Sequence, residues 1–216
     1  MPVVYLIDER MKNPRSLLDD VPAEDMGFLI SSFKRVPEFI EEVDAAIAAY
    51  RPPPKPNSGG NVRPQAPLIT ELRILAQGDV HELQLGRGVD VTNAVQFAPL
   101  SSHLRSSSSQ SCSLLGCDIT AGSFRRERFL GGLSTQQRIG SPFDGWQYDG
   151  SQLRDGAGYP LLHALARTLR VPVTAGVSPQ GTPKDCQFSG ATVTIDPFGK
   201  VSFAGVDLDD PSCRAF

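Results

Sequence analysis

Short apolar runs of strand length alternate with segments of helical periodicity, and this alternation restricts the possible folds of the chain most strongly. Apolar residues recur at helical spacing from Phe39 to Tyr50 and from Tyr159 to Leu169, with a proline at an early helical position in both segments. Strands alternating with helices predict an α/β fold with a mainly parallel central sheet and helices on both faces. The strand-like runs are residues 3–7 (VVYLI), 27–31 (GFLIS), 68–75 (LITELRIL), 111–122 (SCSLLGCDITAG) and 171–175 (VPVTA).

Smaller elements are expected between and after these runs. Residues 82–85 (ELQL) alternate polar and apolar side chains, as a short exposed strand does, and residues 86–88 (GRG) form a turn. A helix is expected within residues 89–104. Near the end of the chain, residues 191–195 and 200–203 flank Asp-Pro-Phe-Gly, which predicts a hairpin.

The 216 residues are best explained by a single domain with two decorations. Residues 51–67 hold six prolines and two glycines, which predicts a Pro-rich surface loop. Residues 123–157 are rich in glycine and arginine and poor in apolar residues, so we expect an insertion at the functional edge of the sheet. Both segments are candidate surfaces for a protein partner.

Composition and charge narrow the functional classes. The net charge of −3 argues against nucleic-acid binding, which needs a basic surface. No apolar run reaches the roughly 20 residues that cross a bilayer, and the N-terminus lacks signal-peptide features. The four cysteines lack metal-ligand spacing, so we expect free thiols, a cytoplasmic location and neither metal nor cofactor. Export without a cleaved signal stays open.

The apolar run at residues 111–122 would deliver Cys117 to the carboxyl edge of the sheet, where open α/β folds place their sites. Asp8, at the end of the first run, would lie at the same edge. A catalytic cysteine needs a base within hydrogen-bond reach. The chain has three histidines. His103 and His163 carry no catalytic signal, whereas His81 follows the strand that precedes the cysteine strand.

Three motifs resemble a known family: LAQGDVHELQLG at residues 75–86, LLGCDITAG at 114–122, and HALARTLRVPVTAG at 163–176. They are similar to the bacterial caspase-like domain called domain of unknown function 4347, a relative of the caspase and clostripain-like cysteine peptidases. The resemblance implies a caspase-like three-layer sandwich with Cys117 at the nucleophile position. It also implies an oxyanion held near Gly78 and Cys117.

The chain departs from the family at the base, because the family motif Ser-His-Gly is replaced by Ala76-Gln77-Gly78. Glutamine cannot take a proton from a thiol at neutral pH. His81 stands four residues further on, about 13 Å along an extended chain, whereas a hydrogen bond spans about 3 Å.

The sequence is therefore compatible with two alternative functions. In the first, the domain has lost peptidase chemistry and is a protein-binding or assembly subunit, with Gln77 at the degenerate base position. In the second, it is an active cysteine endopeptidase with Cys117 as nucleophile and His81 as base. Asp8, Asp79 and Asp118 would then bind a basic substrate side chain, although capping of loops is the competing explanation for these acids.

A third interpretation is a small-molecule site at the sheet edge. The glycines near residue 86 do not form a phosphate-binding pattern that would support it.

Overall fold

The computed structural model describes residues 2–50, 69–78, 82–104, 111–115, 159–176 and 192–204. The N-terminal half contains β1 (Val3–Asp8), α1 (Pro14–Asp19), β2 (Met26–Ile30), α2 (Val36–Ala49) and β3 (Glu71–Leu75). Then follow β4 (Gln77–Gly78), β5 (Glu82–Gln84), β6 (Val89–Asp90), the 3₁₀ helix η1 (Ala94–Ser102), β7 (Ser111–Leu115), α5 (Tyr159–Leu169), β8 (Val173–Gly176), β9 (Thr192–Ile195) and β10 (Val201–Ala204).

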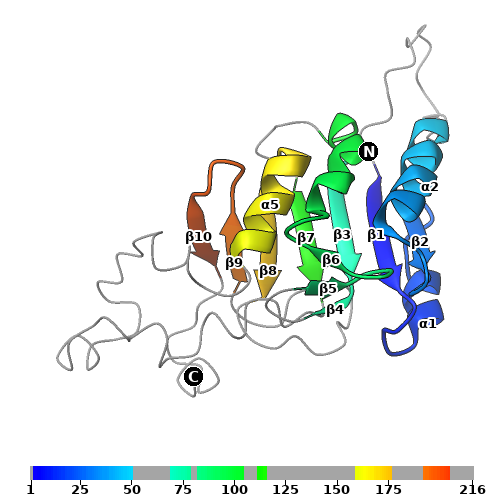
Figure 1. Ribbon diagram of the computed structural model, residues 1–216. Helices are drawn as coiled ribbons and strands as arrows, with labels where there is room; N and C mark the ends of the chain where they lie inside the picture. Colours follow the sequence, from blue (N-terminus) through cyan, green and yellow to red (C-terminus); the bar gives the residue numbers. More distant parts are fainter. Residues whose placement is uncertain are drawn as a thin grey trace, which may run out of the picture.

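A seven-stranded sheet in the order β10-β9-β8-β7-β3-β1-β2 forms the centre of the molecule (Figure 1). The five strands from β8 to β2 run parallel, and β9 and β10 are antiparallel to their neighbours. The predicted α/β fold with a mainly parallel sheet is confirmed. A second, small antiparallel sheet joins β4, β5 and β6 beside it.

Both faces of the large sheet carry helices, which is compatible with a three-layer arrangement. Alternate residues of the parallel strands, such as Leu6, Ile74 and Leu114, form the main core with α2, η1 and α5. In Figure 1, α2 and α5 cross in front of the strands. On the opposite face, Ile7, Leu75 and Leu115 form a smaller cluster that includes Leu17 of α1.

The two longer helices follow the predicted pattern closely. Helix α2 has proline in its first turn, and the Glu38 side chain accepts a hydrogen bond from the Arg35 backbone N–H at its start. Helix α5 buries the apolar face expected from the sequence, which comprises Leu161, Leu162, Leu165, Ala166 and Leu169. These faces account for both helices, because burial of one apolar stripe stabilises a helix more than intrinsic propensity does.

The C-terminal hairpin is confirmed as β9 and β10, with Ile195 paired to Val201. The Asp196 side chain accepts hydrogen bonds from the backbone N–H groups of Phe198 and Lys200 at 2.9 and 2.8 Å. Gly199 adopts a φ of 85°, which a side chain would disfavour.

The expected helix within residues 89–104 is wrong in type and extent. The segment opens with the two-residue strand β6 and continues as the 3₁₀ helix η1. Pro99 lies inside η1, and because proline lacks a backbone donor, a regular α-helix is disfavoured there. Strand β3 is also shorter than predicted. Ile69 forms only an isolated parallel bridge with Leu104, before β3 begins at Glu71.

Several predictions fall outside the described residues. These are the Pro-rich loop at 51–67, the insertion at 123–157 and the continuation of the cysteine strand beyond Leu115. In the part of the chain that is described, no helix combines the length and the apolar character needed to cross a membrane.

Candidate functional site

Three adjacent parallel strands end together at the carboxyl edge of the sheet. Ile7 of β1 is the register partner of Leu75 in β3, and Leu75 is the partner of Leu115 in β7. The Ala76 backbone N–H donates to the Leu115 carbonyl at 3.2 Å, so the two chains stay adjacent just past β3. The segments that follow these three residues therefore leave the sheet from the same level along the strands.

Gln77 and Gly78 leave β3 directly into a hairpin. Gln77 pairs with Gln84 and Gly78 with Leu83 in the antiparallel pair β4–β5. The Gln77 side chain is exposed, whereas Leu83 is fully buried and fixes the hairpin to the main core. The residue at the predicted base position thus stands on a short strand anchored by a buried leucine.

Four predicted site residues lie outside the described residues: Cys117, Asp118, Asp79 and His81. The described residues nearest to them in sequence are Leu115, Gly78 and Glu82. Cys117 follows Leu115 by two positions, just as Gln77 follows Leu75 by two. Asp79 and His81 stand between Gly78 and Glu82, which belong to β4 and β5.

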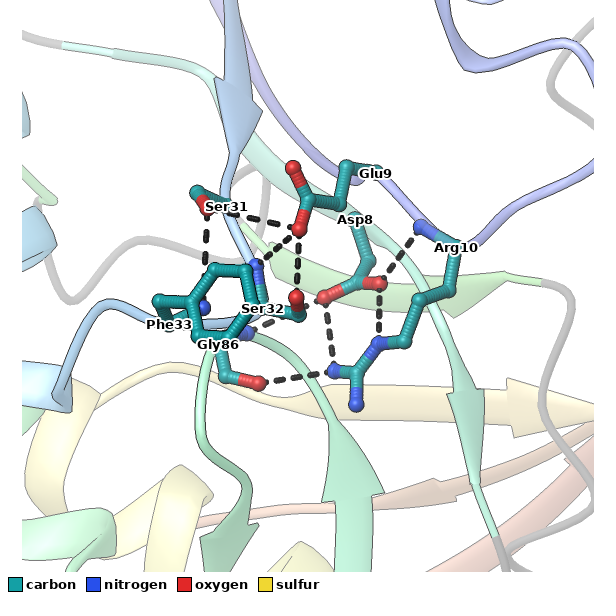
Figure 2. Close-up of polar contacts among 7 residues, drawn as sticks. All are labelled: Asp8, Glu9, Arg10, Ser31, Ser32, Phe33 and Gly86. Atoms are coloured by element: carbon teal, nitrogen blue, oxygen red, sulfur yellow. Dashed lines mark hydrogen bonds and ion pairs between the residues drawn. The ribbon is translucent and has the colours of Figure 1, made fainter.

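Asp8 is the most buried charged side chain of the described chain, with 1% of its surface exposed. Figure 2 shows its carboxylate between Arg10 and Gly86. Oδ1 accepts from the Arg10 backbone N–H at 2.9 Å and from Arg10 Nε at 2.7 Å. Oδ2 accepts from Arg10 Nη2 at 2.9 Å and from the Gly86 N–H at 3.0 Å. Each oxygen accepts two hydrogen bonds, which uses the full capacity of a carboxylate.

Arg10 and Asp8 together hold the loop that follows β5. Arg10 Nη2 also donates to the Gly86 carbonyl at 2.8 Å, so both backbone polar groups of Gly86 have partners in this pair. Hydrogen bonding to Asp8 raises the pKa of the Arg10 guanidinium above its usual value. The Arg10 side chain is 39% exposed, so the pair connects the buried edge of β1 to the surface.

Gly86 cannot be replaced by another residue without strain. Its φ is +61°, and a Cβ added there would lie 2.5 Å from the Lys34 carbonyl oxygen. The Arg87 N–H donates to this same carbonyl at 2.8 Å, and Arg87 Nε donates to the Phe33 carbonyl at 2.9 Å. The loop after β5 is therefore fastened to both β1 and the segment after β2.

Glu9 organises the chain that leaves β2 at the same edge. One carboxylate oxygen accepts from both the hydroxyl and the backbone N–H of Ser32, the latter at 2.7 Å, and from the Ser31 hydroxyl at 3.3 Å (Figure 2). These hydrogen bonds, led by that of the Ser32 hydroxyl, lower the pKa of Glu9 below its ordinary value. Glu9 is therefore ionised at neutral pH beside Arg10.

Asp90 and Asn93 form a reciprocally hydrogen-bonded turn that leads into η1. Asp90 Oδ1 accepts from the Thr92 hydroxyl at 2.6 Å and from the backbone N–H groups of Thr92 and Asn93. Asn93 Oδ1 in turn accepts from the Asp90 N–H at 2.9 Å. The hydrogen bond from the Thr92 hydroxyl lowers the pKa of Asp90 most strongly. This turn directs the chain from the candidate site back across the sheet.

The two described histidines have structural surroundings. His103 Nε2 lies 2.8 Å from Asp44 Oδ1, and the His103 carbonyl accepts from Ile69, which precedes β3. His103 is therefore at the amino edge of the sheet, opposite Asp8. His163 is half-buried on α5 with its ring 5.5 Å from that of Tyr159, as expected for a packing residue.

Arg10 and Gly86 are site residues that the sequence analysis did not identify. An arginine two positions after a strand-ending aspartate is a local signal that would have found Arg10. The partnership with Gly86, 76 residues away, has no such signal. Cys112, in contrast, is a fully buried cysteine of the main core and not a second candidate nucleophile.

The described residues offer no metal centre, because no group of three His, Cys, Asp or Glu side chains among them could hold an ion. Comparisons with family models, curated proteins and solved structures find no match to the chain.

The Asp8–Arg10 pair predicts a measurable loss of stability when its cation is removed. Arg10→Ala leaves a buried carboxylate without its fork of donors, and we expect a loss of about 2–3 kcal/mol in the free energy of unfolding, less than for a fully buried pair. Arg10→Lys keeps the charge but not the bidentate geometry and should lie in between. Urea denaturation measures the difference, with exposed Arg15→Ala as control. Equal stability of Arg10→Ala and Arg15→Ala would contradict a stabilising role of the Asp8–Arg10 pair.

The turn held by Asp90 predicts a pH-dependent contribution to the free energy of unfolding. Because the folded-state pKa of Asp90 is lowered from 3.8, its stabilisation is complete above that value and is lost as the pH falls through the folded-state pKa. Asp90→Ala should cost about 1 kcal/mol near neutral pH. Urea denaturation at pH values from about 7 down to about 3 should show that the stability lost in Asp90→Ala becomes smaller as the pH falls.

Asp90→Asn is the matched control for this measurement, since the asparagine oxygen can accept the same hydrogen bonds in the turn but does not titrate. The stability difference between Asp90→Asn and Asp90→Ala should persist at low pH. A stability loss in Asp90→Ala that stays constant over the whole pH range would be inconsistent with an ionised Asp90.

Proposed function

We propose that the chain is a caspase-like domain that has lost its catalytic base and serves as a protein-binding or assembly subunit. One observation carries the proposal. Strands β3 and β7 are adjacent and parallel, with Leu75 opposite Leu115 at their carboxyl ends. Gln77 and Cys117 each follow these residues by two positions, so they hold equivalent places in the sequence after two neighbouring strands.

The residue at the base position lacks the required chemistry. A thiol becomes an effective nucleophile when a neighbouring base takes its proton or a cation stabilises the thiolate. The Gln77 amide is neutral at all physiological pH values and supplies neither function. His103 is engaged with Asp44 at the opposite edge of the sheet, so this histidine is not a substitute.

The acids at the edge give further support to a non-catalytic role. All four acceptor positions of Asp8 are filled by Arg10 and Gly86, so this carboxylate has no capacity left for a basic substrate side chain. The role of Asp79 and Asp118 in binding stays a prediction. The partner would contact the Pro-rich segment at 51–67 or the segment at 123–157, since the sequences of both are poor in apolar residues.

The alternative, an active cysteine endopeptidase with His81 as base, is favoured by the hairpin. Gly78 and Leu83 are direct cross-strand partners, and such residues have Cα atoms about 5 Å apart. The two described ends of this segment are therefore close together, and the separation of about 13 Å for an extended segment does not apply to them. Cys117 would be the nucleophile, and Gly78 would contribute to the oxyanion site.

Peptide hydrolysis distinguishes the two functions. We expect the purified protein to leave Lys- and Arg-containing fluorogenic peptides uncleaved, because no imidazole activates the Cys117 thiol. The rate should then equal the background of Cys117→Ala. Hydrolysis that is lost in Cys117→Ala and His81→Ala but kept in His163→Ala would establish the endopeptidase instead.

A further inference from the structure

Among the described residues, strand β2 is an edge of the sheet, and its own sequence lacks the features that usually prevent pairing. It is hydrogen-bonded to β1 on one side, and it is the last strand in the order of the sheet. Its sequence, MGFLI, contains no charge and no proline, and its register with β1 is unbroken from Met26 to Ile30. Charged residues, prolines and bulges are the devices that normally prevent edge pairing, and β2 has none of them.

The outward backbone groups of β2 belong to Gly27 and Leu29. The Ile30 carbonyl accepts from the Glu9 N–H, so the polar groups of Ile30 point toward β1. In a strand, the N–H and C=O of one residue point to the same side, and successive residues alternate. Gly27 and Leu29 therefore direct two donors and two acceptors away from the sheet.

The side chains beside these groups are apolar. Leu29 is 36% exposed. Leu18 and Val21 fill the space beside Gly27 on the same face, since a Cβ at Gly27 would lie 2.5 Å from Leu18 and 3.2 Å from Val21. Both are partly buried apolar residues packed against the smaller core cluster. A leucine placed opposite Gly27 would meet this apolar surface.

A second β2 strand in antiparallel orientation meets these requirements. With Phe28 at the two-fold axis, Gly27 of one copy lies opposite Leu29 of the other, and the four outward groups of each copy are paired. Side chains opposite each other share a face, so each Leu29 lies next to Gly27 of the other copy, beside its Leu18 and Val21. The same surface is thus used by both copies.

The charges that flank β2 favour this orientation. Glu24 and Asp25 directly precede the strand, and Lys34 and Arg35 follow it closely. Antiparallel pairing brings the acidic end of one copy next to the basic end of the other, whereas parallel pairing would bring like charges together. Both cations already contact carboxylates of α2, so the charges select orientation more than they add affinity.

From these observations we infer that the chain self-associates through β2, as an antiparallel two-fold dimer with a continuous sheet across both copies. The inference goes beyond the proposed function and depends only on the described edge strand. It holds whether or not Cys117 is catalytic. Because a single short strand makes a small interface, the dimer is expected to be concentration-dependent.

Sedimentation velocity over a concentration series of the full chain tests this inference. We expect a monomer–dimer equilibrium, and we expect Leu29→Lys to weaken it at least about tenfold, since a lysine on an edge strand opposes pairing. Val95→Lys is the matched control, because Val95 is 61% exposed on η1. A chain that stays monomeric at every concentration, or a dimer unaffected by Leu29→Lys, would overturn the inference.

Zero-length carboxyl–amine cross-linking of a mixture of ¹⁴N- and ¹⁵N-labelled chains tests the orientation without any variant. We expect mixed-isotope links between Lys34 and Glu24 or Asp25, which antiparallel pairing brings together. Dimers whose mixed links all join other surfaces would contradict pairing through β2.

Discussion

The common register of β1, β3 and β7 determines how the rest of the molecule is organised. Ile7, Leu75 and Leu115 lie side by side, with buried side chains on the smaller of the two core clusters. A slip of one residue in any of these strands would turn its apolar side chains from one core face to the other, so the register is strongly specified. From these aligned residues, Asp8 follows by one position in the sequence, and Gln77 and Cys117 each follow by two. The candidate site is therefore a consequence of how the core packs.

The edge is completed by long-range polar contacts that add rigidity instead of reactivity. Asp8 is buried and fully hydrogen-bonded by Arg10 and Gly86, and Glu9 fixes the chain after β2 through Ser31 and Ser32. Removal of one partner from such a pair is costly, since an unpaired buried charge is left behind. These contacts hold the hairpin β4–β5 and the loop at Gly86 against the sheet. A rigid edge of this kind suits a binding surface, and it would equally position a catalytic residue if His81 acted as base.

Periodicity and turn chemistry were sufficient to predict much of the fold from the sequence. Strand β1, helices α2 and α5 and the hairpin at Asp196 have patterns in which local preference and burial agree. Pro99 made the helix before β7 a 3₁₀ helix, where apolar spacing alone had indicated an ordinary one. The site was less accessible. The acid Asp8 could be placed at the edge from its position after a strand, but its pairing with Gly86 depends on tertiary contacts across 78 positions. No local pattern encodes such a contact.

We propose that Gln77 occupies the base position next to an unactivated Cys117. This proposal is tested by the pH dependence of Cys117 alkylation, followed on its peptide by mass spectrometry. In the wild-type chain the rate should rise only toward the ordinary thiol pKa of about 8.5, whereas Gln77→His should accelerate it near neutral pH by about tenfold. Gln96→His, an exposed change on η1, should leave the profile unchanged. A wild-type thiol that reacts rapidly near neutral pH and slows in His81→Ala, or a Gln77→His profile identical to that of the wild type, would contradict the account.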